Sequence, residues 1–157
     1  MQCFAKSDRG AVRKENQDRA AGARIRRKGC VVGVVCDGMG GAAGGKLASE
    51  LAASTFLAQF RREMMAGSAV EPAMRAACDA ANQAVYGRAC ADPELHGMGT
   101  TIVAACVRHG RLTVLHVGDS RAYLVGPRRM QQITTDHSLV QLSLIHISEP
   151  TRRTPIS

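Results

Sequence analysis

The stretch "VVGVVCDGMGG", residues 31–41, decides how this chain folds. A continuous run of glycine and β-branched residues leads into Cys36, as is typical of a buried strand. The run ends in an acid, Asp37, and five of the next eight residues are glycine. Glycine lets the backbone adopt unusual conformations and approach a ligand closely, so a functional strand end is one interpretation. Composition alone favours the other interpretation, that Asp37 is only a turn residue or the cap of a following helix.

Two helices are predicted to follow the glycines. Residues 45–67 carry apolar side chains four positions apart, and Gly67 ends the run. Residues 70–89 repeat the helical spacing, and Pro72 suits a first turn. The two helices stand between the early strands and a later group of strands.

Short strands are predicted on both sides of the helices. Residues 2–6 are a strand candidate, and residues 7–22 are expected to form a loop and an edge segment. Short polar or Gly/Pro breaks separate the later strands, which implies antiparallel neighbours. Strands, two helices and then a meander indicate an α+β fold rather than a doubly wound sheet. The later strands are residues 100–107, 111–117, 121–126 and 129–134.

Composition narrows the classes of function. A chain of 157 residues with 45% hydrophobic residues suggests one domain with a real core. The net charge of +8 makes an acidic or phosphorylated partner plausible. Nucleic-acid binding is not indicated, because the basic residues are scattered and lack stacking aromatics. The densest basic run, residues 24–28, is interpreted as a solvated hairpin tip.

The six cysteines point to reduced, mostly buried thiols. No C-x-x-C pair occurs, so a zinc site is not expected. Cys3 and Arg9 have the spacing of a phosphate-binding C-x₅-R loop, but no catalytic context surrounds them and we regard the match as chance. The N-terminus lacks the apolar core of a signal peptide, and no stretch is long enough to span a membrane. We therefore expect a cytoplasmic protein that does not bind membranes.

Three acids lie at strand ends or beside tight turns: Asp18, Asp37 and Asp119. Strand ends let a sheet present several carboxylates to one point, and oxygen ligands suit Mg²⁺ or Mn²⁺. The carbonyl of Gly38 is a further possible ligand. Asp119, within "GDSR", has the same alternative as Asp37, namely a turn residue without a ligand role.

Five stretches in order resemble the motifs of the metal-dependent serine/threonine protein phosphatases of type 2C, in their bacterial form. The resemblance covers residues 4 to about 141. It implies a layered α-β-β-α sandwich of two antiparallel sheets flanked by helices, with two metal ions at one end. The sandwich is expected to be incomplete in this chain. The matching stretches are residues 7–18, 34–52, 98–105, 115–125 and 131–141.

The resemblance implies a role for each site residue. Asp18 would ligate one metal ion, Asp37 would bridge both, and the Gly38 carbonyl would complete one coordination shell. Asp119 matches an acid that helps to hold a third, weaker ion in some bacterial members. Arg13 matches the arginine that holds the substrate phosphate, for which a bidentate guanidinium is well suited.

The implied activity is hydrolysis of phosphoserine and phosphothreonine in proteins, with Mn²⁺ or Mg²⁺ as cofactor and no protein nucleophile. The expected substrates are phosphoproteins of a Ser/Thr kinase, and the protein is expected to be a monomer. Anti-sigma-factor antagonists are an alternative substrate class with the same chemistry. Another alternative is a non-catalytic phosphoprotein-binding module that uses Arg13 and the basic surface.

The C-terminal end departs from the family pattern. The family continues with two more metal-ligating aspartates, and neither occurs here. Instead residues 142–157, "LSLIHISEPTRRTPIS", look like translated sequencing-adapter read-through. We therefore expect residues 1–141 to be the N-terminal part of a phosphatase domain and residues 142–157 to be a non-native tail that contributes nothing to the core and cannot supply the missing strands. On this interpretation the chain by itself is inactive.

Overall fold

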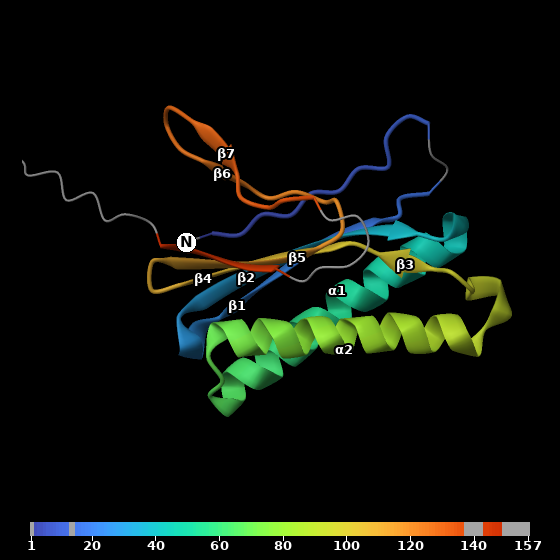
Figure 1. The fold of residues 1–157 in the computed structure, drawn as a ribbon, viewed down its shortest axis with the longest axis horizontal. Helices are drawn as coiled ribbons and strands as arrows, with labels where there is room; N and C mark the ends of the chain where they lie inside the picture. Colours follow the sequence, from blue (N-terminus) through green and yellow to red (C-terminus); the bar gives the residue numbers. More distant parts are fainter. Residues whose placement is uncertain (1, 13–14, 137–142, 149–157) are drawn as a thin grey trace, which may run out of the picture.

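The computed structural model describes residues 2–12, 15–136 and 143–148 of the chain. Its main element is a six-stranded antiparallel sheet, in which β1, β2, β4, β5 and β8 are neighbours in that order and β3 pairs with the end of β2. Two long helices lie against this sheet (Figure 1). The strands of the sheet are β1 (Asp18–Ile25), β2 (Cys30–Met39), β3 (Gly99–Thr100), β4 (Ile102–Arg108), β5 (Arg111–Val117) and β8 (Ser143–Ser148).

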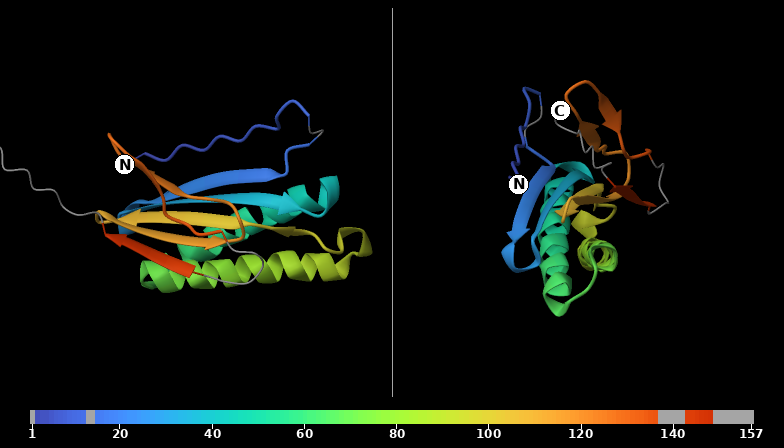
Figure 2. Two further views of the ribbon diagram at one scale, coloured as in Figure 1. Left: turned by 45° about the horizontal axis from the view of Figure 1, so that its top comes forward. Right: turned by 90° about the vertical axis from the view of Figure 1, so that its left-hand side faces the viewer.

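Both helices cover the same face of the sheet, as the views in Figures 1 and 2 show. They are α1 (Gly41–Ala66) and α2 (Val70–Ala91). The described residues also form two short 3₁₀ helices, η1 (Arg26–Lys28) and η2 (Pro93–Leu95). The predicted end of the first helix is confirmed, because Gly67 takes φ 101° beyond it. The helix starts at Gly41, four residues earlier than the predicted start at residue 45.

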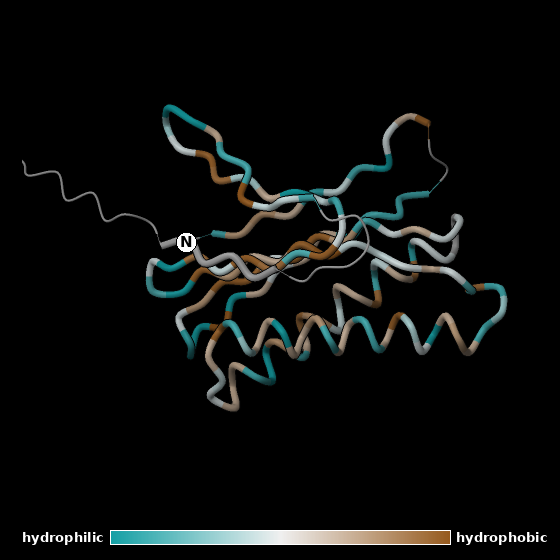
Figure 3. The backbone as a smooth tube through the Cα atoms, in the orientation of Figure 1, coloured by the Kyte–Doolittle hydropathy of each residue, from teal (hydrophilic) through white to brown (hydrophobic). Residues whose placement is uncertain are grey.

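The core lies between the helices and the inner face of the sheet. Alternate residues of β2 are buried there, including Val32, Val34 and Cys36. On α1, the parallel rings of Phe56 and Phe60 stack with centroids 6.2 Å apart, and both side chains are fully buried. The hydropathy colouring in Figure 3 places apolar segments along the central strands. Because side chains alternate along a strand, the residues between these core positions belong to the outer face.

The outer face carries a two-stranded antiparallel sheet, formed by β6 (Tyr123–Val125) and β7 (Met130–Gln132) (Figure 1). The segment after β7 is attached to β5, because Nε2 of the buried His116 lies 2.6 Å from the carbonyl oxygen of Thr135. The two-sheet α+β arrangement is thus confirmed. Within the described residues, helices cover the main sheet alone, so the expected fourth layer is not part of this structure.

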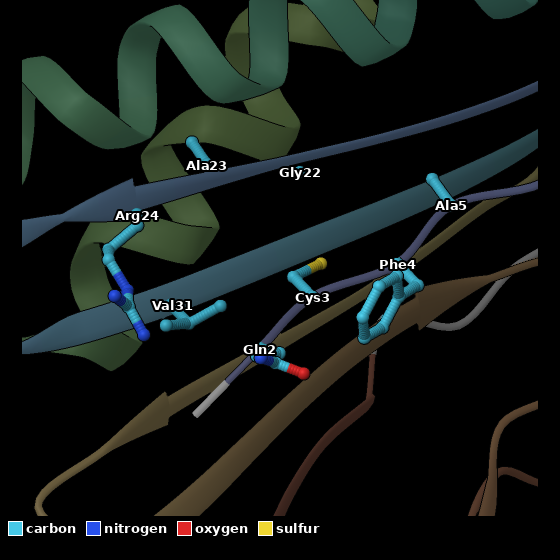
Figure 4. Close-up of a pocket in the computed structure, with 8 residues that line it drawn as sticks. All are labelled: Gln2, Cys3, Phe4, Ala5, Gly22, Ala23, Arg24 and Val31. Carbon is cyan, nitrogen blue, oxygen red and sulfur yellow. The ribbon is translucent and has the colours of Figure 1, made fainter.

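Residues 2–6 do not form the predicted strand. The segment runs beside the outer face of β1 and β2, with Phe4 largely exposed (Figure 4). The Cys3 thiol lies over Gly22 and Gly33, which are paired across the two strands and have no side chains to displace it. A hollow of about 490 Å³ results between this segment and the sheet. The strand-like composition was misleading because it cannot show whether a partner strand lies alongside.

The sequence did not predict a strand within residues 142–157. Residues 143–148 form β8, which pairs antiparallel with β5, for example Leu144 with Leu115. The sequence "TTDHSLVQ", residues 134–141, also predicts the start of a helix capped by Thr135 or Asp136, and this segment falls mostly on residues outside those that the structure describes. A strand edge accepts any extended segment, because ladder bonds are made by backbone groups. A tail rich in Leu and Ile can therefore pair even though it resembles nothing in the family.

One surface feature agrees with the sequence. The basic run at residues 24–28 lies at the turn between β1 and β2, where Arg26 and Arg27 are exposed, so the solvated hairpin tip is confirmed. No helix among the described residues is long and apolar enough to cross a membrane.

Candidate metal-binding site

Asp18 and Asp37 lie directly opposite each other in the antiparallel pair of β1 and β2. Asp18 is the first residue of β1, and Asp37 comes near the end of β2. Because Cys36 faces the helices, Asp37 belongs to the outer face, and Asp18 shares that face as its cross-strand partner. Directly opposite residues have Cβ atoms about 4.5–5.5 Å apart, so both carboxylates can reach one cation or two adjacent ones. Both residues are exposed to solvent.

The backbone of Asp37 is held by Thr100, the last residue of β3, and by Thr101, which follows it. Its carbonyl oxygen accepts hydrogen bonds from the Thr101 N–H at 2.9 Å and from the Thr100 hydroxyl at 3.0 Å. Its N–H donates to the Thr101 hydroxyl oxygen at 3.0 Å. The carboxylate of Asp37 is therefore presented from a fixed backbone, as a metal ligand requires.

Gly38 is the point of closest contact between β2 and α1. A Cβ atom built on Gly38 would lie 1.9 Å from the carbonyl oxygen of Gly45. The N–H of Gly38 donates to the carbonyl of Gln17 at 3.1 Å, and the Gln17 side chain donates to the carbonyl of Gly41 at 3.0 Å. The glycines that follow Asp37 thus bring strand, helix and the residue before Asp18 together. This packing requires glycine at positions 38 and 45, because a Cβ atom at either would overlap with neighbouring atoms.

The residues before and after Asp119 make close contacts that hold its turn in place. Before it, Gly118 has φ +100° and packs against Thr101. After it, the hydroxyls of Ser120 and Thr101 lie 2.6 Å apart, and Nε of Arg121 donates to the Asp136 carboxylate at 2.9 Å. These hydrogen bonds to Asp136 raise the pKa of the Arg121 guanidinium above its ordinary value. Asp119 itself is exposed.

The sequence-predicted site residues are brought together in part. Asp18, Asp37 and Gly38 meet at one end of β1 and β2, and the Asp119 turn is joined to them through Thr101. Arg13 lies outside the described residues. No group of three or more His, Cys, Asp or Glu side chains within the described residues could hold a metal ion. The described acids therefore fit as part of a ligand set, with oxygen donors suited to Mg²⁺ or Mn²⁺.

Sequence reasoning did not assign a role to Thr100, Thr101 or Ser120. The available signal was weak: two adjacent threonines follow a glycine, and a serine follows Asp119. Neither pattern shows that a hydroxyl lies beside Asp37, because the two residues joined by that hydrogen bond are 64 positions apart.

The thiols form no part of a reactive site. All six cysteines are free, and Cys30, Cys36, Cys78 and Cys106 are buried. Burial raises the pKa of Cys36 and of Cys106 to about 12, so both thiols stay protonated at neutral pH. A protonated, buried thiol is a poor nucleophile. The predicted burial is thus confirmed for these four cysteines.

Comparison with known proteins agrees with this geometry. The profile of the family described as Protein phosphatase 2C matches residues 9–141. The chain belongs to this protein phosphatase 2C family. It is similar to the serine/threonine protein phosphatase PstP of Mycobacterium tuberculosis, with 39% identity over 138 residues, or 87% of this chain and 25% of the relative. It is also 34% identical to the serine/threonine phosphatase stp of Listeria innocua over 89% of this chain and 56% of the relative.

Solved structures show the same likeness. The catalytic domain of PstP in complex with two manganese ions matches with a TM-score of 0.71 and 37% identity, over 83% of this chain and 54% of that one. Serine/threonine phosphatase Stp1 from Staphylococcus aureus matches with a TM-score of 0.71 and 32% identity, over 83% and 52%. The chain thus spans between a quarter and about half of the lengths of these relatives.

Proposed function

We propose that this chain provides the Asp18–Asp37 part of a metal-dependent phosphatase that hydrolyses phosphoserine and phosphothreonine in proteins. The observation that carries the proposal is the direct cross-strand pairing of these two acids on the outer face of the sheet. Like charges placed directly opposite each other destabilise a sheet, and a cation bound between the two carboxylates would offset this repulsion. Family membership and the named phosphatase relatives support the same chemistry.

The cofactor proposed is Mn²⁺ or Mg²⁺, as two ions with a third in addition. Asp18 would bind one ion, Asp37 would bridge both, and the Gly38 carbonyl would add a neutral oxygen. Asp119 would contribute to the third position, from a turn that Thr101 joins to Asp37. When bound, such ions acidify water and neutralise charge on a transferring phosphoryl group. The protein's part is to keep both carboxylates on one face and exposed to substrate.

Arg13 is proposed to hold the substrate phosphate. It lies five positions before Asp18 in the same motif, and its guanidinium can donate two parallel hydrogen bonds to a phosphate dianion. The acids and the arginine would have different roles. The acids bind the cations, and Arg13 orients the anion.

The 157-residue chain by itself is proposed to be inactive. The described residues contain no ready-made cluster of three ligands, so two adjacent ions would lack sufficient protein charge. We propose that residues 1–141 are the family-derived part, in agreement with the family match over residues 9–141. Residues 142–157 are proposed to be foreign to it, although part of them pairs with β5.

The proposed substrates are proteins phosphorylated by a serine/threonine kinase. The proposed oligomeric state is a monomer. The six free thiols support a reducing, cytoplasmic setting, since oxidising compartments favour disulfides.

Phosphate release from a phosphothreonine peptide tests the proposal. The assay compares the 157-residue chain with the product of the genomic reading frame that continues from residue 141. We expect Mn²⁺-dependent turnover, abolished by EDTA and by Asp37→Asn, in the longer product alone. Peptide binding without turnover in that product would favour a phosphoprotein-binding module. Activity that survives EDTA would contradict the metal-dependent mechanism.

A further inference from the structure

The antiparallel ladder beside β2 is interrupted between Val35 and Gly38, and Thr101 lies within this gap. Val35 pairs with Val103 and Gly38 with Thr100, so the same register places Asp37 opposite Thr101. The Thr101 N–H makes the expected bond to the Asp37 carbonyl. The Asp37 N–H donates to the side-chain hydroxyl of Thr101 at 3.0 Å. Thr101 belongs to neither β3 nor β4, and the sheet departs from regular pairing beside the candidate site.

The same hydroxyl has a second contact. Oγ1 of Thr101 lies 2.6 Å from Oγ of Ser120, in the turn that carries Asp119. A hydroxyl has one hydrogen and two lone pairs, so Oγ1 can accept from the Asp37 N–H and still share a hydrogen with Ser120. The Thr101 methyl group packs against Gly118: a Cβ atom built on Gly118 would lie only 2.7 Å from the methyl carbon. Thr101 is only 4% exposed, which keeps water from competing for these bonds.

We propose that Thr101 is a positioning residue whose hydroxyl couples the backbone of Asp37 to the turn that carries Asp119. The inference rests on the proposed function in that it treats both acids as cation ligands. Through one side chain, the end of β2 and the turn after β5 are held in a fixed relation. A shift of either acid is transmitted to the other through a buried hydrogen-bonded pair.

Valine at this position makes a specific change. It keeps the branched shape but removes the hydroxyl, so the Asp37 N–H must turn to the Thr101 carbonyl or lose its partner. The first outcome restores a regular ladder, and the sheet therefore need not unfold. Both outcomes move the backbone that presents the Asp37 carboxylate. Serine, in contrast, keeps the hydroxyl and loses the methyl group.

The experiment uses the 157-residue chain with Thr101→Val, Thr101→Ser and Ser120→Ala. The matched control is Thr113→Val, which removes a buried hydroxyl from β5, opposite Cys106. Two quantities are measured: hydrogen exchange of the Asp37 amide, and the Mn²⁺ concentration that half-saturates paramagnetic broadening of nearby amides. Neither depends on phosphatase activity.

We expect Thr101→Val to accelerate exchange of the Asp37 amide at least tenfold and to weaken Mn²⁺ binding at least threefold. Thr101→Ser and Thr113→Val should stay within twofold of the parent in both measurements. Ser120→Ala should keep the Asp37 amide protected but weaken Mn²⁺ binding, because it releases the Asp119 turn.

Two outcomes would overturn the proposal. An unprotected Asp37 amide in the parent chain would mean that the hydrogen bond is not formed. Unaltered Mn²⁺ binding in Thr101→Val, or a serine variant that behaves like valine, would mean that the hydroxyl does not position the acids. Equal Mn²⁺ binding by Asp37→Asn and the parent would instead contradict the proposed metal site itself, so the two failures are distinguishable.

Discussion

Asp18 and Asp37 form a directly opposed cross-strand pair of like charges on the outer face of the main sheet. The two residues belong to neighbouring strands that are joined by a short turn, so the pairing is fixed by local register as well as by the sheet. This opposition is the basis of the first prediction.

Asp37→Asn should change stability in opposite directions with and without metal. In EDTA, the substitution removes a like-charge pair and should raise the free energy of unfolding by about 0.2–1 kcal/mol. With millimolar Mn²⁺, the parent should gain stability from binding and the variant should gain much less. Urea unfolding under both conditions measures this. Asp79→Asn, on the exposed face of α2, is the control that should respond to neither condition. Destabilisation by Asp37→Asn in EDTA would show that Asp37 is a structural turn residue.

Gly38→Ala should destabilise the fold severely. The added Cβ would lie 1.9 Å from the Gly45 carbonyl oxygen, so strand β2 and helix α1 would have to separate locally. We expect a loss of at least about 3 kcal/mol in the free energy of unfolding, as for other forced overlaps in a packed region. Gly87→Ala is the matched control: Gly87 lies in the C-terminal part of α2, its added Cβ would meet nothing within 4 Å, and the substitution should stabilise the fold by about 0.5–1 kcal/mol. Similar unfolding midpoints for both variants would contradict the close contact.

The buried thiols should make the fold sensitive to alkali. Burial raises the pKa of Cys36 and Cys106 to about 12 and that of Cys78 to about 11, from an ordinary value of 9.0. Above pH 9 the unfolded chain releases these protons while the folded chain retains them, so unfolding is favoured as pH rises. Their contribution is constant below pH 9 and is lost between pH 9 and the raised pKa values. The slope approaches about 1.4 kcal/mol per pH unit for each thiol.

Urea unfolding at about pH 7.5, 8.5, 9.5 and 10.5 measures this loss of stability, because these values span the range in which thiols titrate in the unfolded chain. Cys78→Ala removes one of the thiols and should give a shallower decline than the parent. Parallel declines in the two proteins would assign the alkaline sensitivity to other groups. Iodoacetamide at neutral pH should modify the exposed Cys3 and Cys90 before the buried thiols.

Removing residues 142–157 should expose the edge of β5. Strand β8 pairs with β5 from Arg111 to His116, so its loss leaves backbone groups of β5 without their ladder partners. We expect β5 amides that bond to β8 to exchange at least tenfold faster, while β2 amides change little. Ile145→Pro in the full chain should act in the same direction, because it removes one N–H from β8. Unchanged β5 exchange after truncation would contradict the pairing of β8 with β5.

Local patterns explain which parts of the fold could be predicted. The β-branched run into Asp37 marks a buried strand, and the spacing of apolar residues marks both helices, because these periodicities need no knowledge of the partner. The start of α1 was placed too late since glycine is a poor helix former. In the structure, Gly44 and Gly45 are helical because their lack of side chains lets α1 approach Met98 and Gly38. Packing overrode local propensity there.

The sequence by itself determined the family, the order of the elements and the acids of the candidate site, because motif spacing and hydrophobic periodicity are local properties of the chain. Only the tertiary structure decided that Asp18 faces Asp37, that β8 lies beside β5, and that the Asp37 N–H meets the hydroxyl of Thr101. Each of these is a pairing between segments. Strand pairing uses backbone groups that all residues except proline possess in full, so composition cannot specify the partner. The choice depends on the packing of the whole domain.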